Sequence, residues 1–84
     1  MMKQEFVSML DLEARIAALF VQNASRFESR LMVSRGSSEV NCKSIMGVVA
    51  LNIREGETIT ITATGADEEA ALDTMVKMLS GVKS

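Results

Sequence analysis

The sequence predicts an α+β domain in which one β-sheet carries helices on one face. Three observations predict this class. Residues 58–63 alternate between threonine and apolar residues, residues 17–24 and 72–79 hold apolar stripes at helical spacing, and Gly36–Ser37 separates two short strand-like runs. The predicted element order is βαββαβα. Because four strands and three helices in 84 residues leave room for one sheet, we expect a single domain over residues 1–84.

The first half of the chain predicts one strand and one helix. Lys3–Met9 alternates weakly, and Phe6 and Val7 are its expected apolar contributors. From Glu13 to about Phe27 the apolar period becomes helical. The residues at i, i+3, i+4 and i+7 are Ala17, Phe20, Val21 and Ala24.

The second half predicts a hairpin, a short helix, a strand and a final helix. Leu31–Arg35 and Ser38–Cys42 form the hairpin, and Ser44–Leu51 is apolar almost all round, as a short helix at the domain edge would be. Glu57–Ala63 is the clearest strand, with threonines on the side that we expect to face solvent. The final helix carries an apolar stripe made by Leu72, Met75, Val76 and Leu79.

Composition excludes several classes of protein. Nine basic against eleven acidic side chains argue against direct nucleic-acid binding, which normally needs a basic face. With one cysteine and no histidine, we expect no disulfide, no metal and no cofactor, and we expect Cys42 to be a half-buried filler. There is no secretory signal pattern and no apolar run long enough to cross a membrane, so we expect a cytoplasmic protein.

Two segments carry a family resemblance: LEARIAALFVQNASRF at residues 12–27 and VNCKSIMGVVALNI at residues 40–53. They closely resemble the phosphocarrier protein HPr of the sugar phosphotransferase system, and the resemblance extends over nearly the whole chain. It implies an open-faced β-sandwich, in which a four-stranded antiparallel sheet has three helices on one face. Because it lacks histidine, the chain resembles in particular the histidine-less HPr-like paralogues of the catabolite repression type.

The first landmark of that family is altered. In HPr a histidine between a leucine and the pair Ala-Arg accepts the phosphoryl group, and this chain has Glu13 there. Asp11 and Ile16 replace a glycine and a proline, so the resemblance implies that the carrier task is lost. Three roles stay open for Glu13: a helix-end charge, which we favour, a fixed anion imitating phosphohistidine, or an acceptor forming an acyl phosphate. Arg15 is placed to pair with it.

The second landmark, a regulatory serine in Lys-Ser-Ile-Met-Gly, is intact as Ser44. A serine before an apolar helix is also a good N-cap, so capping alone is the alternative interpretation. The resemblance implies phosphorylation of Ser44 by HPr kinase/phosphorylase, after which the protein serves as corepressor for the catabolite control transcription regulator. It also implies that the helices containing Arg15 and following Ser44 are adjacent. The expected partner-binding residues are Arg15, Val21, Gln22, Ile45, Met46 and Val49.

We therefore expect a regulatory protein of carbon catabolite control, not an enzyme, that works through phosphorylated Ser44. Two alternatives stay open: an interaction module that modulates metabolic enzymes without phosphorylation, and a degenerate phosphocarrier. We also expect that the segment Ser8–Met9–Leu10 can act as a hinge for strand exchange, which would produce a homodimer.

Overall fold

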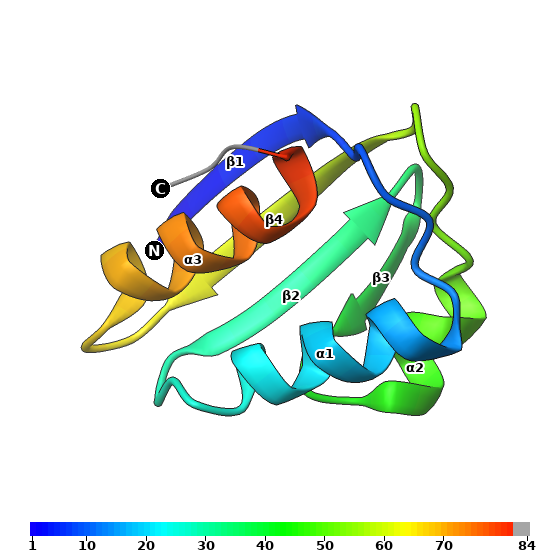
Figure 1. The fold of residues 1–84 in the computed structure, drawn as a ribbon. Helices are drawn as coiled ribbons and strands as arrows, with labels where there is room; N and C mark the ends of the chain where they lie inside the picture. Colours follow the sequence, from blue (N-terminus) through cyan, green and yellow to red (C-terminus); the bar gives the residue numbers. More distant parts are fainter. Residues whose placement is uncertain (82–84) are drawn as a thin grey trace.

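One four-stranded antiparallel sheet with three helices on one of its faces makes up the structure, a computed structural model that describes residues 1–81 (Figure 1). The predicted fold class is therefore confirmed, while residues 82–84 of the predicted domain lie outside the described part. The strands are ordered β1-β4-β2-β3. In chain order the elements are β1 (Met2–Val7), α1 (Ala14–Ala24), β2 (Arg30–Arg35), β3 (Ser38–Asn41), α2 (Ile45–Leu51), β4 (Thr58–Thr64) and α3 (Glu68–Ser80).

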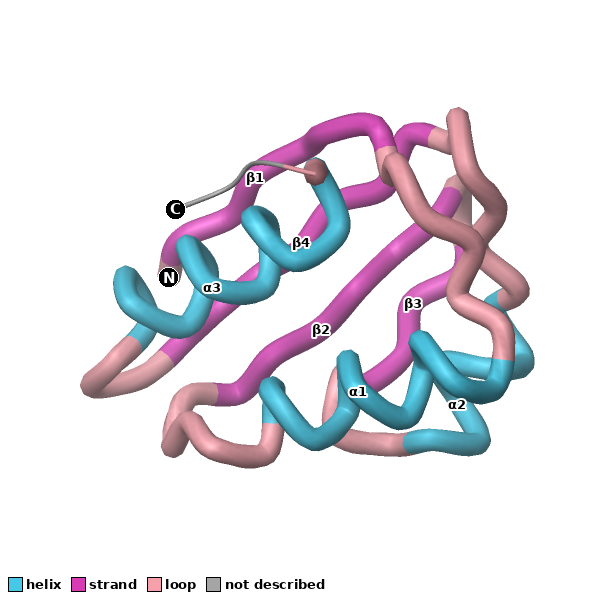
Figure 2. Tube along the Cα trace, in the orientation of Figure 1, coloured by secondary structure: helices cyan, strands magenta, loops and turns pink. Residues whose placement is uncertain are grey.

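The helices divide the covered face of the sheet between them. α3 packs on β1 and β4, whereas α2 packs on β3 at the other edge, and α1 lies against both α2 and α3 (Figure 2). The opposite face stays open, and the threonines of β4 line it. Thr58 and Thr64 are exposed there, as the alternation of β4 predicts.

The register of β1 corrects one prediction. Residues directly opposite one another in an antiparallel pair share a face. Phe6 pairs with the buried Ile59 and packs against the core, as expected. Val7 pairs instead with Thr58 on the open face and is exposed, so its predicted core role is wrong.

Three elements end earlier than predicted, and local hydrogen bonds follow the ends of two of them, β1 and α1. β1 ends at Val7, since Ser8 is buried and its hydroxyl donates to the carbonyl of Leu10 at 2.7 Å. α1 ends at Ala24, after which the chain continues in turns rather than in the helix predicted up to Phe27. β3 likewise ends at Asn41, one residue before the predicted end.

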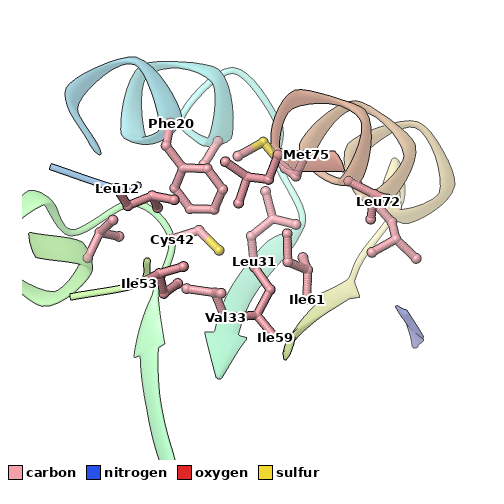
Figure 3. Close-up of a cluster of buried hydrophobic side chains, with 14 of the residues drawn as sticks. Leu12, Phe20, Leu31, Val33, Cys42, Ile53, Ile59, Ile61, Leu72 and Met75 are labelled. Carbon is pink, nitrogen blue, oxygen red and sulfur yellow. The ribbon is translucent and has the colours of Figure 1, made fainter. Parts of the chain in front are cut away.

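The core is aliphatic and lies between the sheet and the helices (Figure 3). Phe20 from α1 and Met75 from α3 cover the sheet residues, and both are fully buried. Cys42 is also fully buried rather than half-buried, and burial raises the pKa of its thiol to about 12. A thiol of this kind is a small apolar filler without reactivity. The sheet side of the core is made by Leu31, Val33, Ile59, Ile61 and Ala63.

The carboxylate of Asp67 joins two loops that are far apart in the sequence. Asp67 precedes α3, but instead of capping that helix it accepts hydrogen bonds from the backbone N–H groups of Glu28 and Ser29, both at 2.9 Å, and from the Ser29 hydroxyl. The Ser29 hydroxyl and then the Glu28 N–H lower the pKa of Asp67. The contact fixes the loop between α1 and β2 and thereby the position of α1.

Candidate functional site

Ser44 is the N-cap of α2, and its geometry agrees with the capping prediction. Its backbone is extended, and its hydroxyl oxygen accepts a hydrogen bond from the N–H of Gly47 at 3.2 Å. The residue is exposed, so the hydroxyl lies at the protein surface. It can cap the helix and remain accessible to an enzyme at the same time.

Three apolar side chains of α2 face solvent directly after Ser44. Met46 is 80% exposed, Val49 43% and Ile45 41%, and we call these three residues the α2 patch. This exposure is what the expected partner-binding role of the three residues requires. Val48 and Leu51, in contrast, are buried in the core. A helix of seven residues on the domain edge buries one side and leaves its other apolar side chains without cover.

Lys43 connects the start of α2 to the loop that follows α1. Its ammonium donates to the carbonyl of Phe27 at 2.7 Å, while its backbone N–H donates to the side-chain oxygen of Asn41 at 2.8 Å. At the opposite end of these two helices, the N–H of Leu12 donates to the carbonyl of Ile53 at 2.8 Å. Leu12 lies just before α1, and Ile53 lies just after α2. The two helices therefore lie side by side and run in opposite directions. Sequence inspection missed the Lys43 contact, because nothing in the local pattern names an acceptor sixteen residues away.

This arrangement positions the expected contact residues of α1 relative to Ser44. Arg15 and Gln22 are seven residues apart, so they share one face of α1, and both are exposed. Val21 is half-buried against the core and offers less surface. Because α1 runs opposite to α2, Gln22 lies at the end near Ser44. Arg15 lies about 10 Å further along the helix axis.

Glu13 is the N-cap of α1 but does not cap it through its side chain. Its carbonyl accepts from the N–H of Ala17 at 2.7 Å, and its carboxylate makes no capping hydrogen bond. Within residues 1–81 no ion pair joins Glu13 to Arg15, so the expected pairing is not found. Both side chains are exposed to solvent. Glu13 is thus a free charge at the start of the helix.

Asp11 is held to the loop after α2, a role that the sequence did not predict. Its carboxylate accepts the N–H of Glu55 at 2.7 Å and lies 3.6 Å from the guanidinium of Arg54. The ion pair of Asp11 and Arg54 therefore lies just before the start of α1. Their separation in sequence explains why the pair was missed.

Metal-binding clusters and membrane-spanning helices are not found in the described part of the chain. Among residues 1–81 no three side chains of the metal-binding types come together. None of the helices there combines the length and the apolar character that are needed to cross a bilayer. The chemistry available at the site is that of an exposed serine hydroxyl, an apolar patch and scattered charges.

The fold and the site together define a small open-faced α+β domain that presents a serine N-cap and apolar side chains at its edge. Residues 4–80 match the family model described as the PTS HPr component phosphorylation site. The chain therefore belongs to the HPr family.

Individual relatives agree with this assignment. The chain is 44% identical over 68 residues to the HPr-like protein Crh of Halalkalibacterium halodurans, with 81% of each chain covered. The crystal structure of HPr-C-His from Thermoanaerobacter tengcongensis matches over 100% of both chains, with 36% identity and a TM-score of 0.88. Crh of Bacillus subtilis, whose crystal structure is described as a swapped dimer, matches with 37% identity and a TM-score of 0.83, covering 94% of this chain and 88% of its own.

Proposed function

We propose that the chain is an HPr-like regulatory protein of catabolite repression that lacks the phosphocarrier histidine. In this proposal HPr kinase/phosphorylase phosphorylates Ser44, and the product acts as corepressor or adaptor for the catabolite control transcription regulator. The similarity to Crh supports the regulatory role. The observation that carries the proposal is the exposed hydroxyl of Ser44 beside the exposed α2 patch.

Phosphorylation at this position would change the surface without changing the fold. A phosphoryl group adds a charge of about −1.5 to −2 at neutral pH. The Ser44 oxygen already receives the Gly47 N–H, and a negative charge at a helix start is favourable. An arginine or lysine of the partner could pair with the phosphate, while apolar side chains of the same partner cover the α2 patch.

The α1 side of the surface completes the proposed interface. Gln22 and Val21 lie toward the Ser44 end, and Arg15 extends the surface along α1. Glu13 has no acceptor role in this proposal, because a carboxylate does not replace imidazole as a reversible phosphoryl carrier. The proposed role is binding rather than catalysis, it is cytoplasmic, and it involves no membrane and no direct contact with nucleic acid.

The test is binding of the regulator after treatment with the kinase and ATP. Wild-type protein should incorporate phosphate and bind, whereas Ser44→Ala should do neither. Ser37→Ala is the matched control, since Ser37 is also an exposed serine but lies in the hairpin turn. Undiminished regulator binding by Ser44→Ala after kinase treatment would refute the proposal.

A second candidate is an interaction module that modulates metabolic enzymes without phosphorylation. The observation in its favour is that the α2 patch is exposed without any modification. Binding of an enzyme by unphosphorylated protein, unaffected by Ser44→Ala and abolished by Met46→Asp, would favour this candidate. Incorporation of phosphate at Glu13 from enzyme I and phosphoenolpyruvate would instead indicate a degenerate phosphocarrier.

We further propose that the chain forms a homodimer by exchanging β1 about the segment Ser8–Met9–Leu10. Crh of Bacillus subtilis is described as a swapped dimer, and an HPr dimer is known from Thermoanaerobacter tengcongensis. In this chain Met9 and Leu10 are exposed, and β1 is an edge strand. Size-exclusion chromatography at several concentrations should resolve monomer and dimer, and a monomer at all concentrations would contradict exchange.

A further inference from the structure

Met46 is the most exposed large apolar side chain of residues 1–81. At 80% exposure, against 41% for Ile45 and 43% for Val49, it is the most accessible member of the α2 patch. It is also the member that contains sulfur. The surface next to Ser44 thus depends on a thioether that water and small oxidants can reach.

The methionines of this chain differ widely in accessibility. Met75 of α3 is fully buried, and Met32 and Met78 are half-buried. Met9 on the segment after β1 is 52% exposed, while Met2 at the start of β1 is 38% exposed and the N-terminal Met1 75%. Oxidation of methionine by small oxidants follows exposure. Met46 is consequently placed to react before the methionines that support the core.

We infer that Met46 is a site of reversible oxidation by peroxides, and that its sulfoxide prevents partners from docking on the α2 patch. The docking half of this inference rests on the proposed function. In the reaction the sulfur attacks one peroxide oxygen, the O–O bond breaks, and the sulfoxide and one water molecule form from hydrogen peroxide. A dithiol-dependent methionine sulfoxide reductase reverses the step, with two electrons and two protons yielding the thioether and water.

The position of Met46 separates an effect on docking from an effect on folding. Its exposed side chain contributes little to the core, so oxidation leaves the fold intact. The sulfoxide oxygen is a strong acceptor that loses its water when a partner covers it without supplying a donor. We expect partner affinity to fall by about fivefold or more.

The first experiment measures where oxidation occurs. Folded protein is treated with limiting hydrogen peroxide and digested, and each methionine-containing peptide is quantified by mass spectrometry over time. Met46 should become sulfoxide faster than Met9, and Met75 should remain reduced. Oxidation of Met46 no faster than of Met9 would overturn the inference.

The second experiment measures docking of the kinase-treated protein on the regulator before and after peroxide. Wild-type binding should fall after oxidation and return after treatment with the reductase. Met46→Leu keeps an apolar side chain but has no sulfur at this position, so its binding, at whatever level it starts, should be the same before and after peroxide. Equal wild-type binding before and after complete conversion of Met46 overturns this inference and leaves the proposed function standing. Absence of binding before peroxide refutes the proposed function, and the docking half of the inference with it.

Discussion

Replacing Ser44 by alanine should lower the free energy of unfolding by about 1 kcal/mol, because it removes the side-chain cap of α2. The cap consists of the hydrogen bond from the Gly47 N–H to the Ser44 hydroxyl at 3.2 Å. Measured losses for such caps span about 0.5–2 kcal/mol, and exposure of Ser44 lets water replace part of the bond. For a domain of this size, about 1 kcal/mol corresponds to a melting temperature lower by about 4–8 °C.

The control is Ser44→Asn, because asparagine is an equally good N-cap but has no hydroxyl to phosphorylate. Its stability should lie within about 0.5 kcal/mol of the wild type. Urea unfolding monitored by circular dichroism and calorimetric melting measure both variants. If Ser44→Ala is as stable as the wild type, or if Ser44→Asn loses as much as Ser44→Ala, the capping argument fails.

Comparison of Ser44→Ala with Ser44→Asn also separates the effect of the cap on stability from the effect of the phosphate on binding. Ser44→Asn retains the fold and the α2 patch, so under the proposed function it should still lose kinase-dependent binding of the regulator. Loss of binding in Ser44→Ala alone would instead indicate that the cap, and not the phosphate, matters to the partner.

Three further predictions follow from the fold. Gly65→Ala should destabilise the protein by roughly 2–4 kcal/mol in urea unfolding, since φ is +150° and the new Cβ would lie 2.7 Å from the Ser29 hydroxyl oxygen. Hydrogen bonds hold the pKa values of Asp67 and Glu68 below their ordinary values, so both groups stabilise the fold above the unfolded-state pKa near 4. That stability is lost as pH falls through the lower folded-state pKa values, and melting curves should show it below about pH 4. Cys42 should react with a thiol reagent at pH 8 at least about a hundredfold more slowly in folded protein than in denaturant, because its pKa is about 12.

Each of these three predictions has an outcome that would contradict it, and the prediction for Gly65 also has a matched control. Gly36 also has a positive φ, +60°, but no atom lies within 4 Å of a new Cβ, so Gly36→Ala should cost only about 1–2 kcal/mol. An equal loss in both variants would refute the close contact at Gly65. Asp67→Asn should melt with a weaker acid dependence, and an unchanged dependence would show that this carboxylate is not involved. Rapid labelling of Cys42 in folded protein would contradict its burial.

Periodicity was sufficient for the architecture, and local chemistry decided where elements end. The alternation around Ile59 and Ile61 correctly predicted the buried and open faces of β4. Val7 was misassigned because β1 is short and alternates only weakly. Which of its alternating side chains face the helices becomes clear only from its register with β4. The end of α1 was placed at Phe27, three residues late. The turns after Ala24 also form hydrogen bonds to backbone carbonyls a few residues earlier, and so they resemble a continuing helix.

The candidate site divides in the same way. Ser44 as an N-cap followed from residue type and from the apolar segment after it. A surface position for Ile45 and Met46 was expected from the resemblance to HPr, because the apolar pattern of the segment fits burial of these side chains equally well. The ammonium of Lys43 on the Phe27 carbonyl was not predictable, because that contact joins segments that meet only in three dimensions.

The sequence by itself determined the periods of burial, the missing histidine and the presence of a serine at a helix start, since these are local properties of residue type and spacing. The tertiary structure alone decided that α1 and α2 run in opposite directions, that Asp67 holds the loop at Ser29, and which methionines are exposed to solvent. Such features depend on contacts between segments far apart in the chain. Their energies arise only when packing of the sheet against the helices brings those segments together.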